Sequence, residues 1–383
     1  MDFSKKRTID DLDLDGKRVL LRCDFNVPLK DGEITYENRI EKAIPTIQKI
    51  VEDGGKLIIC SHLGKPKGEP KKELSLAVVA KVLSQKLGKD VLFAADDNVV
   101  GDNAKRAVEN MKKGDIVLLE NTRFRKEETK NEENFSKELS LLADVFVNDA
   151  FGAVHRAHCS TVGVAKYVKE TAIGYLIEKE LKFLGQAIEN PKRPFVNILG
   201  GAKVSDKLGV IENLLKSADV LIIGGGMSYT FLKAKGFNTG NNFVEVEKID
   251  YCRELLDKYN DKIILWVDAY TSNKEYKLVS ELNDNDECLD IGEKTVELFK
   301  TYLEKSNTIF INGPFGLFEN DDFSKGSKSM CEVFKKLNSK IYAGGGETTY
   351  MLNKFNVDNV FMSTGGGATL TYLSTGKLIG IIE

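Results

Sequence analysis

The sequence has few of the features that mark secreted, disulfide-stabilised or membrane proteins. Its six cysteines are scattered, with no C-x-x-C pair and no metal-site spacing. No apolar run approaches the roughly 18 residues of a transmembrane helix. Lys5-Lys6-Arg7 is not followed by the apolar stretch of a signal peptide. We therefore expect a reduced, cytoplasmic protein that does not act at a membrane.

An excess of charge of one sign and two common nucleotide-binding motifs are also missing. The net charge is −3, so no basic field predicts binding to nucleic acid. The chain has no G-x-x-x-x-G-K-[ST] loop, which excludes a Walker-type site. It has no G-x-G-x-x-G following a strand either, which counts against dinucleotide oxidoreductases and protein-kinase-like enzymes.

What is present is a regular alternation of short apolar strands and helical patterns over 383 residues, enough for about two domains. This alternation predicts an α/β fold with parallel sheets covered by helices on both faces. A helical pattern from about residue 173 to 190 is expected to connect the two halves. Strands are expected at 18–23, 56–60, 91–94, 115–119, 144–147, 195–199, 219–223, 262–267, 307–311, 340–343 and 359–362, and helices, for example, at 39–53, 75–87, 131–142, 205–216, 293–304 and 327–337.

The turn Gly200-Gly201-Ala202-Lys203 joins a predicted strand to a predicted helix, with Ser205 as the expected N-cap. A glycine turn that feeds a helix N-terminus exposes backbone N–H groups and suits an anion. Lys203 and Lys207 would add two positive charges there. A tight strand–helix turn with solvated lysines explains this turn alone equally well.

The predicted strand ends carry different chemistry in the two halves. Eight of the ten arginines and all three histidines precede residue 160, whereas every triple glycine follows residue 220. Arginines at strand ends indicate a small, strongly anionic ligand, because guanidinium pairs bidentately with phosphate or carboxylate. Surface ion pairs are the ordinary alternative for any one arginine. A metal set of His62, His155 and His158 is another alternative, but His-x-x-His on a loop is only a weak zinc signal. Glycines at strand ends suit a nucleotide, which needs close backbone approach.

Several longer strings identify a family. Asp24-Phe-Asn-Val-Pro28, Ser61-His-Leu-Gly64, Leu119-Glu-Asn-Thr-Arg-Phe124 and Asn148-Asp-Ala-Phe-Gly152 resemble phosphoglycerate kinases. So do Leu199-Gly-Gly-Ala-Lys-Val-Ser-Asp-Lys207, Gly224-Gly-Gly-Met227, Asn312-Gly-Pro314 and Ser363-Thr-Gly-Gly-Gly-Ala368. The match runs in order from about residue 17 to the end.

The resemblance implies transfer of a phosphoryl group between 1,3-bisphosphoglycerate and ADP, giving 3-phosphoglycerate and ATP, with Mg²⁺, in a monomer. It implies two Rossmann-like parallel-sheet domains joined by a long helix, with the C-terminal segment returning to the N-terminal domain. The expected phosphoglycerate-binding domain covers 1–172 plus about 366–383, the connecting helix 173–190 and the nucleotide-binding domain 191–365.

The resemblance also assigns site residues. The substrate site is expected to contain Asp24, Asn26, Arg39, His62, Lys65, Arg123 and Arg156. The nucleotide site is expected to contain Gly201, Lys203, Lys207, Gly225, Asn312, Pro314, Glu319, Gly345, Gly346, Glu347 and Thr348. Arg39, Lys203 and Gly346 are expected to act on the transferred phosphoryl group, and Glu347 to contact the metal.

Three residues depart from the family's pattern: Lys65 replaces a common arginine, Glu347 replaces the usual metal-binding aspartate, and Phe361 replaces a histidine near the hinge. The chemistry itself needs no general base, because the attacking carboxylate is already ionised at neutral pH. It needs positioning, charge neutralisation and closure of the two halves. A non-catalytic polyanion-binding protein and another doubly wound nucleotide enzyme are the alternative functions.

Overall fold

A computed structural model describes residues 6–381, and these residues form two compact units. The first contains residues up to 182 and the last part of the chain from 377, and the second contains 183–376. The boundary falls within α5 (Tyr175–Leu184), which continues into a π-helical turn at Gly185–Glu189. Residues 1–5 and 382–383 of the expected first domain lie outside the described residues.

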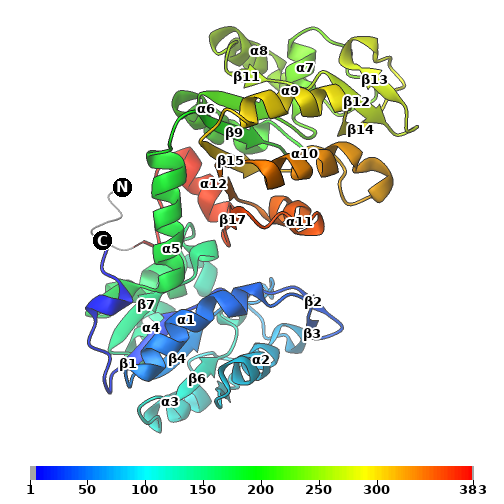
Figure 1. Cartoon of the computed structure of the whole chain (residues 1–383). Coiled ribbons are helices and arrows are strands. Elements are labelled where there is room, and N and C mark those ends of the chain that lie inside the picture. The colour runs from blue at the N-terminus through cyan, green and yellow to red at the C-terminus, as the bar shows by residue number, and fades with distance from the viewer. Residues whose placement is uncertain (1–5, 382–383) are drawn as a thin grey trace. The chain divides into compact units, whose positions relative to one another are not determined.

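The first unit is built on a six-stranded parallel sheet with the order β5-β6-β4-β1-β7-β8 (Figure 1). The strands are β1 (Arg18–Arg22), β4 (Lys56–Cys60), β5 (Leu92–Ala94), β6 (Ile116–Leu119), β7 (Val145–Asn148) and β8 (Glu170–Ile173). A two-stranded hairpin, β2 (Leu29–Lys30) with β3 (Glu33–Ile34), lies outside this sheet. The parallel order directs all six carboxyl ends to one edge, where a ligand site is expected.

Each face of this sheet has its own apolar core, because successive strand side chains point to opposite faces. In β1, Val19 and Leu21 pack with α1 (Asn38–Glu52) and α2 (Ala77–Leu87). Leu20 belongs to the opposite cluster, with α3 (Asp102–Glu109) and α4 (Glu133–Leu141). Near-continuous apolar strands are therefore what a doubly covered parallel sheet requires.

The second unit repeats this design with a parallel sheet of order β11-β10-β9-β15-β16-β17 (Figure 1). Its strands are β9 (Phe195–Leu199), β10 (Val220–Ile223), β11 (Ile263–Ile264), β15 (Thr308–Asn312), β16 (Lys340–Ala343) and β17 (Val360–Met362). Its helices are α6 (Leu208–Ser217), α7 (Ser228–Ala234), α8 (Ile249–Lys258), α9 (Glu293–Leu303), α10 (Lys325–Lys336), α11 (Gly346–Lys354) and α12 (Gly366–Thr375). A separate antiparallel sheet joins β13 (Tyr276–Leu278), β12 (Asp268–Thr271) and β14 (Cys288–Ile291).

The expected α/β fold with parallel sheets is confirmed, and the strands form close to the expected positions. Two local expectations need correction, and some strands were not predicted. The strand expected at 262–267 is reduced to Ile263–Ile264, and the β12–β14 sheet and β8 were not predicted. Ser205 is not an N-cap, because a short 3₁₀ turn at Ser205–Lys207 precedes α6 and the Ser205 hydroxyl donates to the Glu245 carboxylate.

The chain returns to the first unit after α12. Nδ2 of Asn148 donates to the carbonyl of Gly380 at 3.0 Å, and the Gly380 N–H donates to the carbonyl of Val154 at 2.6 Å. Residues 366–376 belong to the second unit, where α12 packs against α6, and the segment from 377 to 381 belongs to the first.

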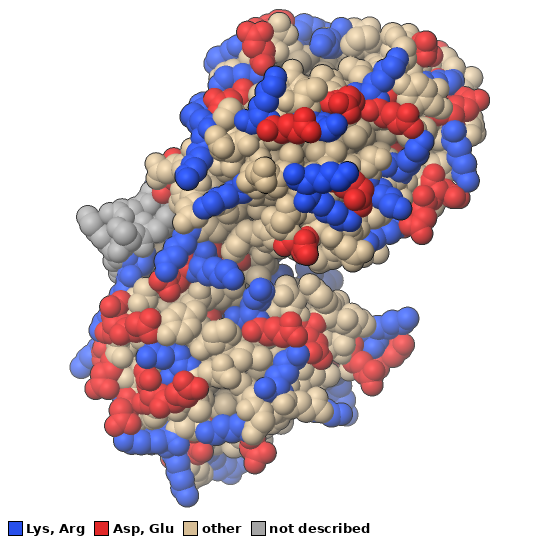
Figure 2. Space-filling model, viewed as in Figure 1, with Lys and Arg blue, Asp and Glu red and all other residues tan. Residues whose placement is uncertain are grey.

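Acidic and basic side chains are interspersed on the face shown in Figure 2. None of the helices formed by residues 6–381 is both long and apolar enough to span a bilayer.

Candidate functional site

The carboxyl edge of the first sheet gathers polar side chains from several strands. Asp24 and Asn26 follow β1, and Oδ1 of Asn26 accepts from the Gly64 N–H at 2.8 Å beyond β4. Arg123, in a 3₁₀ turn after β6, donates from Nη1 to the Gly64 carbonyl at 2.8 Å. The loops after β1, β4 and β6 are thus tied together at the edge where the sequence places the substrate residues.

Asp24 and Arg39 form an ion pair in which the carboxylate is buried. Burial alone would raise the pKa of Asp24, but the electrostatic effects of Arg39, His62 and Arg22 and the Asn26 N–H together outweigh it and lower the pKa below its usual range. Gly152 leaves room for this pair, because a Cβ there would lie 2.2 Å from Oδ2 of Asp24 and 3.1 Å from Nη1 of Arg39. Gly152 therefore supports the site, although the sequence marked it only as part of a motif.

His62 is buried behind this pair and contacts a second arginine. Its Nδ1 lies 3.0 Å from Nη2 of Arg22, a fully buried side chain whose Nε donates to Oγ of Ser160 at 2.7 Å. Ser160 in turn donates to the buried carboxylate of Glu128. Burial lowers the pKa of His62 well below 6.5, so the ring is neutral at pH 7. Sequence reasoning missed Arg22; a charged residue directly after the apolar run 19–21 was the available signal.

The first unit also contains a cavity of about 690 Å³, and Lys65, Arg123 and Arg156 line it. No carboxylate is among the side chains that line it within the described chain. Burial, together with the charges of Arg156 and Arg22, lowers the pKa of Arg123 to about 10, and its buried Nε has no hydrogen-bond partner among residues 6–381. Crowded cations with an unused donor are suited to an anionic ligand.

In the second unit, three backbone segments meet at the carboxyl ends of β9, β10 and β15. The Met227 N–H donates to the Gly201 carbonyl at 2.8 Å, and the Gly225 N–H to the Phe315 carbonyl at 3.1 Å. Gly225 has φ +63°, and a Cβ there would lie 2.7 Å from N of Gly201 and 3.1 Å from the carbonyl oxygen of Pro314. No larger residue fits, so the backbone itself forms this surface, as a nucleotide site requires.

Lys207 and Asn312 lie at the centre of this second site. Nζ of Lys207 donates to Oδ1 of Asn312 at 2.7 Å and also to the carbonyl of Gly200. Nδ2 of Asn312 donates to the Gly344 carbonyl at 2.7 Å, and the Gly313 N–H to Oγ1 of Thr348 at the same distance. Burial lowers the pKa of Lys207 to about 8, against the opposing effect of the Glu347 charge. Lys207 is therefore not the solvated lysine of the alternative interpretation.

The remaining nucleotide-site candidates surround this centre or stand apart from it. Lys203 is exposed, with Nζ 5.6 Å from the ring centroid of Phe243. Gly345 has φ +100°, and Gly346 begins α11, where an added Cβ would meet nothing within 4 Å. The backbone carbonyl of Glu319 accepts a hydrogen bond from Nζ of Lys354 at 3.1 Å. Glu347, in the first turn of α11, is exposed.

The side chains of this site could bind Mg²⁺ only together with phosphate oxygens of a ligand. No group of three or more histidine, cysteine or acidic side chains within residues 6–381 is placed to hold a metal. Magnesium commonly takes one or two carboxylates and completes its octahedron with phosphate oxygens and water. An exposed Glu347 at a helix N-terminus, close enough to affect Lys207, can supply one such carboxylate.

Phe361 stands where the resemblance leads one to expect a histidine. Its ring stacks on Phe183 with centroids 4.6 Å apart and planes at 17°, and Tyr342 lies 6.3 Å away. At this position of the second unit, Phe361 therefore packs against aromatic rings.

Comparison with known proteins gives one consistent result. A family model described as phosphoglycerate kinase matches residues 9–377. The phosphoglycerate kinase of Clostridium tetani is 55% identical over 388 residues, covering 98% of this chain and 97% of the relative. That of Clostridium botulinum strain 657 is 54% identical and covers 100% and 98%. Among solved structures, the Coxiella burnetii phosphoglycerate kinase matches with a TM-score of 0.89 at 38% identity, covering 98% of both chains.

Proposed function

Because the chain belongs to the phosphoglycerate kinase family, we propose that each of its two units binds one of the two substrates of the family's reaction. The enzyme transfers a phosphoryl group between 1,3-bisphosphoglycerate and ADP, with 3-phosphoglycerate and ATP as the other pair of substrates. In this proposal the first unit binds the phosphoglycerate and the second binds the nucleotide. The carboxylate-free cavity lined by Lys65, Arg123 and Arg156 is the observation that supports this division most directly.

The first unit acts by charge neutralisation and orientation. Arg123 and Arg156 pair with the phosphate of the phosphoglycerate, and Lys65 supplies a point charge where the family commonly has a bidentate guanidinium. Arg39, oriented by Asp24, faces the reacting carboxylate end. His62 donates a hydrogen bond from Nε2, because Nδ1 accepts from Arg22. No residue has to remove a proton, since the attacking carboxylate is ionised.

The second unit holds the triphosphate on backbone N–H groups and lysines. Gly201, Gly225 and Pro314 bring bare backbone to the nucleotide, and Lys207 neutralises phosphate charge. Hydrogen bonds of Asn312 and Thr348 join the loop after β15 to the loop after β16. Lys203 moves from the Phe243 ring to the transferred phosphoryl group, where Arg39 and the N–H of Gly346 complete the neutralisation.

In-line transfer requires donor and acceptor atoms roughly 3–3.5 Å apart with water excluded. We therefore propose that the units close when both substrates are bound. Small-angle scattering should give a smaller radius of gyration with both substrates than with either alone. An identical radius in all four ligation states would contradict closure.

Bound Mg²⁺ would neutralise and orient the phosphate oxygens of the nucleotide. Glu347 is its proposed protein contact, reaching one methylene further than aspartate. Glu347→Gln keeps the shape and removes the charge, so it should raise the Mg²⁺ concentration needed for half-maximal activity. Glu347→Asp is the matched control and should stay active. An unchanged Mg²⁺ titration in Glu347→Gln would show that Glu347 does not contact the metal and only stabilises the start of the helix.

Two experiments test the function as a whole. A coupled assay with 3-phosphoglycerate and MgATP should show turnover, and its absence would contradict the assignment. Thermal melting should shift upward with MgADP and with 3-phosphoglycerate added separately. A shift with generic polyanions alone would favour a non-catalytic polyanion-binding protein, and none of the relatives supports that alternative.

We further propose a cytoplasmic monomer that binds neither nucleic acid nor membranes. Six cysteines without a disulfide support a reducing compartment. The net charge of −3 gives no overall positive field that would attract nucleic acid. Light scattering of the purified protein and fractionation of cells test these two statements.

A further inference from the structure

The turn that carries Lys203 is held by a carboxylate from a distant segment. Glu245 is 4% exposed and directly precedes a 3₁₀ turn at Val246–Lys248. Its Oε2 accepts from the Val204 N–H and, at 3.1 Å, from the Ser205 N–H, and its Oε1 accepts from the Ser205 hydroxyl. One buried carboxylate therefore satisfies three donors directly after Lys203.

These donors need a partner from outside the turn, because the first N–H groups of a helical segment have no acceptor within it. Ser205 does not supply one, since its hydroxyl donates to Glu245. A negative charge is also favourable at this position, because the N-terminus of a helix carries a partial positive charge. Glu245 is thus the cap that the local sequence lacks, and it fixes the backbone between Lys203 and α6.

The backbone of Glu245 is fixed in turn. Its N–H donates to Oγ1 of Thr230 at 3.1 Å, and Thr230 is buried within α7. Met227, directly before α7, donates from its N–H to the carbonyl of Gly201 at the other end of the Lys203 turn. Both ends of this turn are therefore tied to α7, one directly and one through Glu245.

The segment that carries Glu245 also meets the side chain of Lys203. Phe243 lies two residues before Glu245, and its ring centroid is 5.6 Å from Nζ of Lys203. Burial alone would raise the pKa of Glu245, but hydrogen bonds from Ser205 and Val204 outweigh it, and the positive charge of Lys203 also lowers the pKa. Glu245 is therefore ionised at pH 7 and attracts Lys203.

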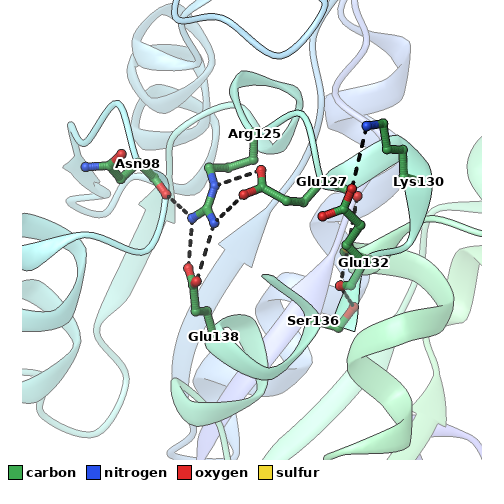
Figure 3. Close-up of polar contacts among 8 residues, drawn as sticks. Asn98, Arg125, Glu127, Lys130, Glu132, Ser136 and Glu138 are labelled. Carbon is green, nitrogen blue, oxygen red and sulfur yellow. Dashed lines mark hydrogen bonds and ion pairs between the residues drawn. The ribbon is translucent and has the colours of Figure 1, made fainter. Parts of the chain in front are cut away.

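A contrast with other carboxylates shows what the loss of Glu245 would do. Figure 3 shows Arg125 between Glu127 and Glu138, with contacts to both carboxylates. Those ion pairs join one side chain to another, whereas Glu245 accepts from two backbone N–H groups. Removing Glu245 would therefore release a stretch of main chain rather than a single side chain.

We propose that Glu245 is a positioning residue for phosphoryl transfer: it holds the turn so that Lys203 reaches the transferred phosphoryl group from a fixed backbone. The side chain of Lys203 moves, and the cap keeps its Cα in place. Glu245 acts through Lys203 and not on the substrates. This role rests on the proposed action of Lys203 on the phosphoryl group.

A double-mutant cycle on kcat, measured with the full chain at saturating substrates, tests the proposal. Glu245→Ala should lower kcat about tenfold, because small displacements of a catalytic group are costly. In the Lys203→Ala background the same substitution should change kcat less than about twofold, since the group that it positions is absent. A further loss of about tenfold in that background would overturn the proposal. An unchanged kcat in Glu245→Ala, beside a reduced kcat in Lys203→Ala, would overturn it as well.

The Michaelis constants separate positioning from loss of binding. The KM for 3-phosphoglycerate should change less than about twofold, because its proposed site is in the first unit. The KM for MgATP should change less than about threefold, because Lys207 keeps its own hydrogen bond to Asn312. An unchanged kcat with a KM for MgATP raised about tenfold would assign Glu245 to nucleotide binding and overturn the proposal.

Glu245→Gln provides a second variant in case Glu245→Ala does not fold. Its amide oxygen can still accept from both N–H groups, but without the charge that strengthens these bonds, so kcat should fall about threefold. The same cycle with Lys203→Ala applies. A threefold loss that persists in the Lys203→Ala background would contradict the positioning role.

Asp268→Ala is the matched control. Asp268 caps α9 in the same unit, accepting from the Lys294 N–H at 2.8 Å, from the Thr295 N–H at 2.7 Å and from the Thr295 hydroxyl. Its loss should lower the free energy of unfolding but keep kcat within about twofold. An equal loss of kcat in Asp268→Ala and Glu245→Ala would mean that kcat reports general loosening of the unit, and would overturn the proposal.

Hydrogen exchange tests the cap without turnover. A peptide covering residues 200–207 should exchange faster in Glu245→Ala than in the wild type, and at the wild-type rate in Asp268→Ala. Unchanged exchange in Glu245→Ala would overturn the cap itself. A near-normal kcat in Lys203→Ala is a separate result: it would contradict the proposed function of Lys203 and overturn the positioning role through its premise.

Discussion

Nη2 of Arg22 lies 3.0 Å from Nδ1 of His62, and both side chains are buried. Arginine has only donors, so Nδ1 is the acceptor and the neutral imidazole carries its proton on Nε2. A buried arginine thus determines which nitrogen of His62 is available to a ligand. It also makes His62 a hydrogen-bond donor rather than a base.

Replacing Arg22 by methionine should destabilise the first unit by about 3–5 kcal/mol, because it leaves the buried Glu128 carboxylate without its charged partner beyond Ser160. Hydrogen exchange of peptides from β1 and β4 measures this free energy of unfolding. Adding Glu128→Gln should recover part of the loss. Simple additivity of the two single changes would show that Arg22 and Glu128 are not coupled.

Arg22 also makes a contact that the sequence does not predict. The positions of Asp24, His62 and Arg123 at the carboxyl edge of the sheet were predictable, because each comes shortly after an apolar run that forms a parallel strand. Arg22 ends such a run, and its partner Ser160 is 138 residues away. The length of an apolar run says nothing about that contact.

The β12–β14 sheet was missed and the Ser205 cap was wrongly predicted, for related reasons. The three strands between 268 and 291 are short and lack a clear apolar alternation. Ser205 has the right residue type for a cap, but Glu245, 40 residues along the chain, takes its hydroxyl and leaves the first turn 3₁₀. In each case a tertiary contact overrides a local preference.

Gly152→Ala should raise the KM for 3-phosphoglycerate about tenfold. The new Cβ would overlap Oδ2 of Asp24 and crowd Nη1 of Arg39, so their ion pair has to separate. The KM for MgATP serves as the internal control and should stay near the wild-type value. Steady-state kinetics with each substrate varied measures both constants, and a parallel rise in both would indicate general misfolding instead.

Asp149→Asn should change how stability depends on pH. Burial raises the pKa of Asp149 to about 7, with Oδ1 accepting from the Ile177 N–H at 3.1 Å and Oδ2 buried without a partner within residues 6–381. A carboxyl whose pKa is higher in the folded state contributes stability at low pH, and this contribution is lost as pH rises toward 7.

The asparagine variant has no such group, so it should gain about 2 kcal/mol relative to wild type between pH 5 and pH 8. Urea unfolding at several pH values measures the difference. The histidines are common to both proteins and cancel. Parallel stability curves for the two proteins would mean that Asp149 titrates normally.

Lys203→Ala should lower kcat by about 10²–10³, because it removes the charge that we propose acts on the transferred phosphoryl group. Arg39→Ala should behave similarly for the same reason. Phe243→Leu is the matched control, since it removes only the aromatic face that Lys203 rests on, and it should change kcat less than about threefold. A near-normal kcat in Lys203→Ala would show that Lys203 does not act on the transferred phosphoryl group.

Lys207 should set the alkaline limit of activity. Burial lowers its pKa to about 8, while the Glu347 charge works in the opposite direction. Only the protonated amine neutralises phosphate, so kcat/KM for ATP should fall about tenfold per pH unit above that pKa. Lys207→Arg keeps its charge at every accessible pH and should lose this alkaline limb, even if its overall activity is lower.

Glu347→Gln removes the charge that supports the protonated form of Lys207, so its alkaline limb should move to lower pH than in the wild type. Glu347→Asp keeps the charge and should leave the limb near its original position. The profiles are measured at saturating Mg²⁺, because Glu347 is also the proposed metal contact and a metal deficit would lower activity at every pH. A limb that stays in place in Glu347→Gln while Lys207→Arg abolishes it would show that Lys207 titrates without help from Glu347.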